Sequence, residues 1–347
     1  MLVGLYTDAH FSQSSSIILG KKDSFSGRLQ NLIESFKWMN EVFVERGVKE
    51  IFCLGDLTDK PNLTSEEISA LGKCNLDGHR FILGNHCRSD KDGYFNSLSV
   101  FEKVYNKPEY LNLDDCIFYL LPYNSTLTDL NSLDPKPDVI LSHNDIMDFN
   151  YGNYLSKTGY ELSDIVSNCR LFINGHLHNG EWLIKNRVMN LGSITGVNFA
   201  SCGGEWDPSI GILDTDTLKV ELIENPIAYK FRKLSFNNYS EVKNYLSSLS
   251  KQNYVLQIKV PQRIVNDVRD LLNDTAAVAA SRVLSLPEQM SVANQIMFEE
   301  LNDKQESLGE YSKSPYEKLK EYVKDKAPAK YSINTILDII DKIEKEA

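Results

Sequence analysis

The chain has 347 residues, 42% hydrophobic and 24% charged, which is a globular composition with enough apolar material for two or three domains. Its net charge is -11, and residues 1–229 hold 19 Lys and Arg against 31 Asp and Glu, which argues against a free-standing nucleic-acid-binding surface there. No apolar run reaches the roughly 18 residues of a membrane span, and the first residues lack the basic start of a signal peptide. We therefore expect no membrane association.

The cysteines also indicate a reducing compartment. All six are scattered, at positions 53, 74, 87, 116, 169 and 202, and none forms a C-x-x-C pair. Most lie beside apolar residues, which predicts reduced, partly buried thiols and not a disulfide framework. We expect a cytoplasmic protein.

The first two thirds of the chain alternate predicted strands with helices, and strands then dominate. The amphipathic pattern of residues 26–46 predicts a helix with one apolar face, and residues 65–73 predict a short capped helix. Strands are predicted at 2–8, 50–56, 80–86, 116–123, 138–145 and 170–178, followed by hairpins at 181–193 and 209–224. This order favours an α/β layered domain with a mixed central sheet.

The pattern changes near residue 229. Predicted strands at 231–236 and 253–260 flank a helix at 239–249, and another helix runs from 262 to 273. The basic stretch "KFRK" at 230–233 is either a phosphate contact or a solvated strand end. After Pro287 the sequence is polar and helical, and it ends in a segment with an Ile and Leu stripe between 333 and 343.

Polar blocks follow the predicted strands. They are Asp8-x-His10, Gly55-Asp56, Gly84-Asn85-His86, Ser142-His143 and Gly175-His176-x-His178. One histidine after a strand is usually a hydrogen-bonded core or surface residue, but strand ends at one edge of an α/β sheet converge, and ligands bind there. The blocks together therefore predict one site.

The residue types in these blocks suit a two-metal centre. Two divalent ions about 3.5–4 Å apart need a bridging carboxylate, and neutral imidazoles and an amide oxygen can fill the outer positions. Mixed nitrogen and oxygen ligands suit manganese, iron or zinc better than calcium or magnesium. Such ions position a phosphate and generate hydroxide from a bound water.

The five blocks, in this order between residues 8 and 178, resemble the calcineurin-like metallophosphoesterase superfamily. The resemblance implies a four-layer α/β sandwich with mixed central sheets. It implies two divalent ions, manganese foremost, with magnesium, iron or zinc as alternatives. The implied ligands are Asp8, His10 and His178 for the first metal, Asn85, His143 and His176 for the second, and Asp56 as the bridge between them.

The same resemblance assigns two catalytic residues. His86 would protonate the leaving oxygen or stabilise the transition state without binding metal, and Asp59 of "GDLTD" would orient it, or else serve as a turn residue. His79 lies outside every motif and is expected to be structural. Cys87 stands where the superfamily usually has an acid; because a thiol accepts hydrogen bonds only weakly, we expect it to hold His86 less firmly.

The organisation beyond the core resembles SbcD-type nucleases of double-strand-break repair, and most of all their compact relatives in T-even phages. The resemblance implies a nuclease domain at 1–228, a small α+β capping domain that presents DNA at 229–286, and a linker with a helical docking segment at 287–347. It also implies a DNA exo- and endonuclease, a coiled-coil ATPase partner of the SbcC type, a homodimer, and the host cytoplasm if a phage encodes the chain. A homodimer would use the 26–46 helix and residues 62–73.

Two other interpretations of the function stay open at this point. A stand-alone phosphatase or phosphodiesterase of the same superfamily would act on a non-DNA substrate. A non-catalytic scaffold would keep the fold and bind a partner, and Cys87 is the one departure that would favour it.

Overall fold

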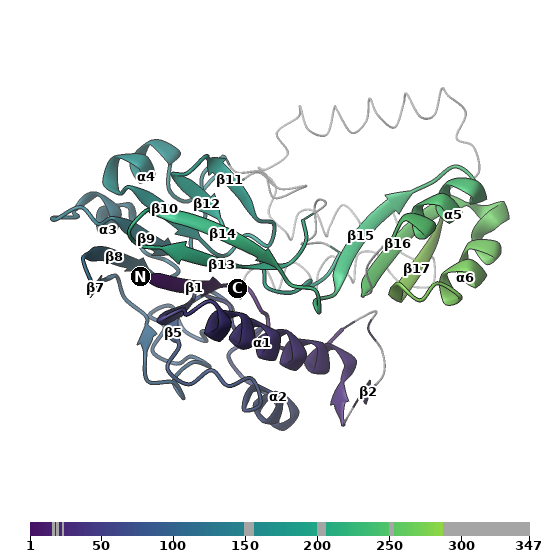
Figure 1. Ribbon diagram of the computed structural model, residues 1–347, viewed down its shortest axis with the longest axis horizontal. Coiled ribbons are helices and arrows are strands. Elements are labelled where there is room, and N and C mark those ends of the chain that lie inside the picture. Colours follow the sequence, from purple (N-terminus) through teal and green to yellow (C-terminus); the bar gives the residue numbers. More distant parts are fainter. Residues whose placement is uncertain are drawn as a thin grey trace, which may run out of the picture. The chain divides into compact units, whose positions relative to one another are not determined.

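Two six-stranded mixed sheets form the main part of the structure (Figure 1). The computed structural model describes residues 1–15, 18, 21–22, 24–148, 156–199, 206–249 and 253–286. These residues lie in one unit, Met1–Leu286. The predicted linker and docking helix at 287–347 lie outside the described residues.

The first sheet has the order β14-β13-β1-β4-β5-β6, and the second has the order β11-β12-β10-β9-β8-β7. The strands of the first sheet are β1 (Leu2–Tyr6), β4 (Glu50–Cys53), β5 (Arg80–Ile82), β6 (Val104–Tyr105), β13 (Ser209–Asp214) and β14 (Lys219–Glu224). Those of the second are β7 (Glu109–Leu113), β8 (Cys116–Leu121), β9 (Val139–Ser142), β10 (Leu171–Asn174), β11 (Glu181–Ile184) and β12 (Val188–Asn190). The small hairpin β2 (Lys21–Lys22) and β3 (Phe25–Ser26) precedes the first helix.

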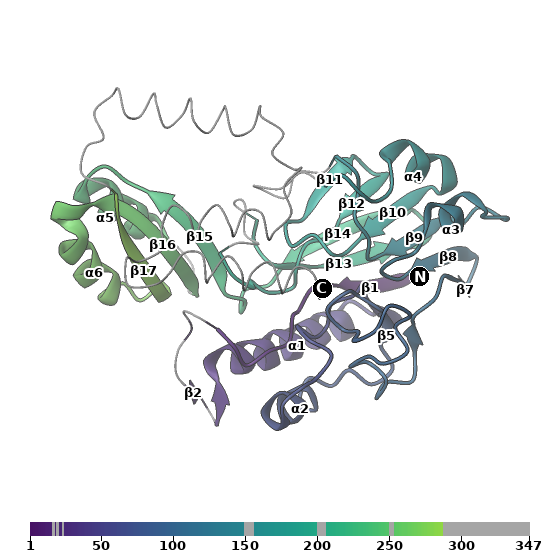
Figure 2. The same ribbon diagram turned by 180° about the vertical axis from the view of Figure 1, so that it is seen from behind.

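Helices cover the outer faces of both sheets. Helices α1 (Gly27–Glu45) and α2 (Ser65–Leu71) lie on one side, and α3 (Leu127–Asn131) and α4 (Leu162–Asn168) lie on the other (Figure 1 and, from behind, Figure 2). Helix α1 begins at the Ser26 cap, whose side chain accepts a hydrogen bond from the amide of Leu29. Its predicted apolar face is buried against the first sheet.

Three apolar layers separate these elements, and the protein is therefore a four-layer α/β sandwich. One layer packs α1 against the first sheet, with Phe36 and Phe43 at its centre. A second lies between the sheets, where the rings of Phe52 and Phe118 stack 6.0 Å apart. A third joins the second sheet to α4 through Phe172 and Ile165. The predicted α/β class with mixed sheets is confirmed.

The central strands of each sheet run parallel. β1, β4, β5 and β6 pair in parallel register, as do β8, β9, β10 and β12. Their carboxyl ends therefore meet at one edge of each sheet. The antiparallel strand β13 pairs with β1 from the other side, with Asp214 opposite Leu2 and Gly211 opposite Leu5.

A third sheet of three parallel strands follows. It contains β15 (Lys230–Ser235), β16 (Tyr254–Pro261) and β17 (Val278–Leu286), connected through α5 (Tyr239–Ser248), the 3-10 turn η1 (Gln262–Ile264) and α6 (Val265–Asn273). The third strand, β17, was not expected from the sequence. The domain boundaries predicted at 228/229 and 286/287 stay predictions.

Two of the three cations in the basic stretch at 230–233 are neither solvated nor free, whereas Lys233 is exposed. The Lys230 side chain is fully buried between Glu224 and Asp207, and Arg232 is 12% exposed and pairs with Asp207. These two cations therefore hold β15 to the residues before it, and they are not free to contact a phosphate. Among the described helices, none is long and apolar enough to cross a bilayer.

Candidate metal centre

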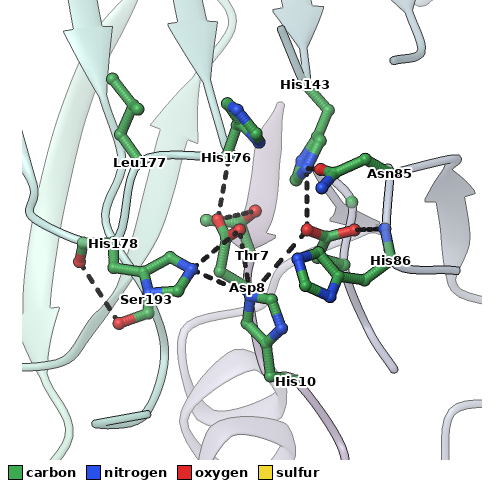
Figure 3. Close-up of polar contacts among 12 residues, drawn as sticks. Thr7, Asp8, His10, Asn85, His86, His143, His176, Leu177, His178 and Ser193 are labelled. Carbon is green, nitrogen blue, oxygen red and sulfur yellow. Dashed lines mark hydrogen bonds and ion pairs between the residues drawn. The ribbon is translucent and has the colours of Figure 1, made fainter. Parts of the chain in front are cut away.

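The predicted site residues come together where the parallel strands end. Figure 3 shows seven of them: Asp8, His10, Asn85, His86, His143, His176 and His178. Asp8 and His10 follow β1, Asp56 follows β4, and Asn85 and His86 follow β5. His143 follows β9, and His176 and His178 follow β10. Strand ends of both sheets thus supply the site, whereas the sequence indicated one edge of a single sheet.

One cluster contains Asp8, His10 and His178, whose candidate ligand atoms lie within 4.8 Å of one another. The Nε2 atoms of His10 and His178 are 2.9 Å apart, and each is 3.8 Å from Asp8 Oδ1. Asp8 Oδ2 accepts hydrogen bonds from Thr7 Oγ1 and the His176 amide. Asp8 Oδ1 is buried with no hydrogen-bond partner among the described residues. Its desolvated charge calls for a cation.

A second cluster contains Asp56, His143 and His176, again within 4.8 Å. His143 Nδ1 lies 2.7 Å from the main-chain oxygen of Leu54, and because a carbonyl only accepts, Nδ1 carries a hydrogen. His143 Nε2 then faces two oxygens at 3.2 Å, Oδ2 of Asp56 and Oδ1 of Asn85. A proton or a metal ion must lie between them.

Asp56 lies between the two clusters. Its Oδ2 is 3.2 Å from His143 Nε2 and 3.9 Å from His10 Nε2, while its Oδ1 accepts from the amide of His86 at 2.9 Å. One carboxylate therefore faces ligands of both clusters, which is the geometry of a bridging ligand.

The pKa values follow from this geometry. Burial opposes ionisation of Asp56, but the charge and hydrogen bond of His143 outweigh it and hold the pKa of Asp56 below its ordinary value. Burial likewise opposes charge on His143, yet Asp56 raises the pKa of His143 to about 9. With its pKa raised in this way, the protonated His143 ring supplies the positive charge that faces the Asp56 carboxylate. Burial, followed by repulsion from His10, lowers the pKa of His178 to about 4, so His178 is a neutral ligand at pH 7.

These residues fit a pair of divalent ions. They offer two carboxylates, four imidazoles and an amide oxygen, and one buried oxygen has no donor. Two glycines keep the space open: a Cβ at Gly84 would come within 2.1 Å of Asp56 Oδ1, and one at Gly55 within 2.1 Å of His143 Nδ1. No larger residue fits at either position.

Four of the site residues hold a left-handed backbone. The φ angles are 52° at Asp8, 43° at His10, 44° at Asp56 and 71° at His176. For residues other than glycine this conformation costs about 1–3 kcal/mol each, and it persists where the surroundings over-determine it.

His86 stands beside the clusters and is 43% exposed. Its Nδ1 lies 3.0 Å from the main-chain oxygen of Asp59, so the main chain orients the ring. The Asp59 carboxylate is 3.9 Å from His86 Nδ1 but 3.1 Å from His10 Nδ1. It is half-exposed, and its pKa is lowered chiefly by the hydrogen bond with His10. Asp59 thus orients a predicted metal ligand with its side chain and His86 with its main chain.

The candidate ligand atoms of His10, Asp59 and His86 also lie within 4.8 Å of one another. Because Asp59 already hydrogen-bonds His10 and the Asp59 main chain hydrogen-bonds His86, we interpret this set as a support for the other two clusters.

Cys87 is buried beneath its loop and contacts Thr58. It is fully buried, and its Sγ lies 3.4 Å from Thr58 Oγ1 and 3.8 Å from the Thr58 main-chain oxygen. Burial raises the pKa of the thiol to about 11. Cys87 therefore packs the 84–87 loop onto the 55–59 loop. The sequence suggested that a thiol at this position would hold His86 less firmly, but in the structure the His86 ring is held by the main-chain oxygen of Asp59.

His79 lies in the core, as its position outside the motifs suggested. It is 5% exposed, its Nδ1 is 3.3 Å from the Tyr6 hydroxyl, and burial lowers its pKa to about 4. Sequence reasoning missed Asp145, whose Oδ1 lies 3.2 Å from His176 Nε2. Its position two residues after His143 was the available signal.

No protein-family model matches the chain, and no curated protein matches it. Solved structures with a partial likeness include the phosphoesterase Yfce from E. coli, with 15% identity and a TM-score of 0.33 over 65% of this chain and 100% of that one. A predicted phosphoesterase from Streptococcus pneumoniae has 16% identity and a TM-score of 0.31 over 65% and 89%. A hypothetical protein from Thermus thermophilus has 11% identity and a TM-score of 0.40 over 65% and 100%. At such values the function has to be inferred from the site itself.

Proposed function

We propose that this chain is a two-metal phosphodiesterase that hydrolyses DNA, as the nuclease subunit of an SbcC/SbcD-like complex in recombination and double-strand-break processing. The observation that carries the hydrolase part of the proposal is the position of Asp56, whose Oδ2 faces both His143 and His10. A single bridging carboxylate flanked by neutral nitrogen ligands suits two closely spaced divalent ions.

In this proposal each cluster holds one ion. Asp8, His10 and His178 hold the first, Asn85, His143 and His176 hold the second, and Asp56 belongs to both. When bound, the ions supply a hydroxide nucleophile and offset charge on the phosphoryl oxygens. Manganese is the proposed metal, with magnesium, iron and zinc as alternatives.

The remaining chemistry falls to His86. Its Nδ1 is bound to the Asp59 carbonyl and its side chain is 43% exposed, so Nε2 is the ring nitrogen left for a substrate. In its protonated form His86 donates from Nε2 to the leaving oxygen as the P–O bond breaks, so that the departing strand leaves as an alcohol. Cys87 takes no part as a nucleophile, because its buried thiol stays protonated at neutral pH.

The DNA substrate and the ATPase partner rest on the resemblance of the whole chain to SbcD-type nucleases, including the compact type of T-even phages. The α+β unit of β15, β16 and β17 supports this proposal, since it follows the core in the place of the capping domain. With Lys230 and Arg232 buried in ion pairs, we propose that the ATPase supplies much of the phosphate contact. A homodimer and a cytoplasmic location, in the host if phage-encoded, belong to the same proposal.

The test is hydrolysis with Mn²⁺ of linear duplex DNA and of bis(p-nitrophenyl) phosphate, a diester without bases. We expect cleavage of both, with the DNA rate increased by the ATPase recovered from the native source. Cleavage of the small diester alone, with the ATPase present, would favour a stand-alone phosphodiesterase. No cleavage of either substrate by protein carrying two ions would favour a non-catalytic scaffold.

A further inference from the structure

Asp145 lies beside the second cluster although it belongs to no motif. It comes three residues after β9, and its Oδ1 is 3.2 Å from Nε2 of His176. The two side chains are 28% and 18% exposed, so the contact is largely shielded from solvent. A carboxylate only accepts, so His176 Nε2 carries the hydrogen and Nδ1 keeps a lone pair.

The backbone around Asp145 is fixed by its neighbours. Asn144 and Asn174 exchange hydrogen bonds, with the Asn144 amide donating to Asn174 Oδ1 and Asn174 Nδ2 donating to the Asn144 main-chain oxygen. The Tyr160 amide donates to the Asp145 main-chain oxygen at 3.1 Å. A Cβ at Gly159 would lie 2.1 Å from that oxygen, so only glycine allows this approach. Asp145 is thus held in place independently of His176.

Two other histidines of the site, His143 and His10, show the same arrangement, whereas Nδ1 of His178 is buried with no hydrogen-bond partner among the described residues. His143 uses Nδ1 to bind the Leu54 carbonyl at 2.7 Å, and His10 uses Nδ1 to bind Asp59 at 3.1 Å. Each ring has one nitrogen fixed by an acceptor while the other faces a cluster. Metal-binding histidines are generally fixed in this way, and loss of the acceptor typically costs 10–100-fold in metal affinity.

We propose that Asp145 is the positioning residue for His176. It accepts the Nε2 hydrogen and thereby fixes the tautomer in which Nδ1 keeps its lone pair for the second ion. This inference rests on the proposed two-metal function, and it adds a residue that acts through His176 without touching the metal.

The test compares Asp145→Ala, His176→Ala and the double variant by titration with Mn²⁺, reading free Mn²⁺ by electron paramagnetic resonance. We expect Asp145→Ala to weaken the second ion about 10–100-fold and to leave the first unchanged. The double variant should bind no more weakly than His176→Ala alone, because residues that act through one another are not additive. Asp145→Asn should retain part of the affinity, since its amide oxygen can accept the same hydrogen bond.

The matched control is Asp148→Asn, an exposed acid in the same loop whose φ of 58° asparagine tolerates. It should bind both ions like the wild type. Additive losses in the double variant, or unchanged affinity in both Asp145 variants, would overturn the role of Asp145 alone. If Asp145→Ala fails to fold, Asp145→Asn decides the question. Wild-type protein that takes up fewer than two ions would overturn the proposed function itself.

Discussion

Replacing His86 by glutamine separates catalysis from metal binding. The His86 ring is 43% exposed, its hydrogen bond goes to a main-chain oxygen, and it belongs to neither of the two clusters that flank Asp56. The variant should therefore keep two ions. Asp56→Asn should lose them, because the carboxylate facing both clusters becomes neutral.

The size of the rate loss depends on the leaving group. A positioned general acid contributes about 10²- to 10⁴-fold, or about 2.7–5.4 kcal/mol at 1.36 kcal/mol per tenfold. His86→Gln should lose this much on DNA, whose sugar oxygen leaves poorly without a proton. It should lose far less on bis(p-nitrophenyl) phosphate, because nitrophenolate is a stable anion.

The assay measures kcat/KM for both substrates with Mn²⁺, together with bound metal after dialysis. Equal losses on the two substrates would show that His86 stabilises phosphoryl charge and does not transfer a proton. Loss of an ion in His86→Gln would refute the assignment, because His86 would then belong to a metal group with His10 and Asp59.

Three further outcomes are expected. Cys87→Ser should keep activity, and the native thiol should resist alkylation at neutral pH, because its pKa is about 11 and it is buried; a dead but folded variant would contradict this. The pKa of His143 is raised to about 9 without metal, so below that pH its proton competes with the second ion. Affinity for that ion should rise with pH up to about 9, and calorimetry in two buffers should show about one proton released per second-site ion at pH 7; equal heats would argue otherwise. Lys230→Met should lower the free energy of unfolding by about 1–3 kcal/mol in urea titrations, since it leaves the partly exposed carboxylates of Glu224 and Asp207 without the cation they share. The exposed Lys219→Met is its control, and equal losses would contradict the buried ion pairs.

The core fold and the position of the site could be predicted from the sequence because both follow from the points at which apolar strands end in polar residues. Apolar strands that end in polar blocks identify the strand ends, and parallel pairing brings those ends together. Asp8, Asp56 and His143 could be assigned to one site without any coordinates. The face of α1 that packs on the first sheet was predicted from the helical period of Leu29, Phe36 and similar residues.

Features that depend on side-chain direction could not be predicted. Asp59 binds His86 through its main-chain oxygen and His10 through its carboxylate. Which of the two groups reaches which histidine depends on the exact course of the 55–59 loop, and the sequence does not specify that course. The contact of Asp145 with His176 joins two loops whose approach depends on Gly159. Strand β17 carries small residues such as Ala279 and Ala280, whose weak strand preference is overridden by pairing with β16.

The left-handed backbone at Asp8, His10, Asp56 and His176 has an evolutionary consequence. Aspartate, asparagine and histidine are the residues other than glycine that enter this conformation most readily, so the ligand types and the backbone geometry select the same amino acids. Glycine would release this strain, but at Asp8 and Asp56 it would also remove the carboxylate oxygens that accept the main-chain hydrogens of His176 and His86. The two aspartates are therefore constrained by the fold as well as by metal binding, and a lineage that has abandoned hydrolysis has a structural reason to keep them.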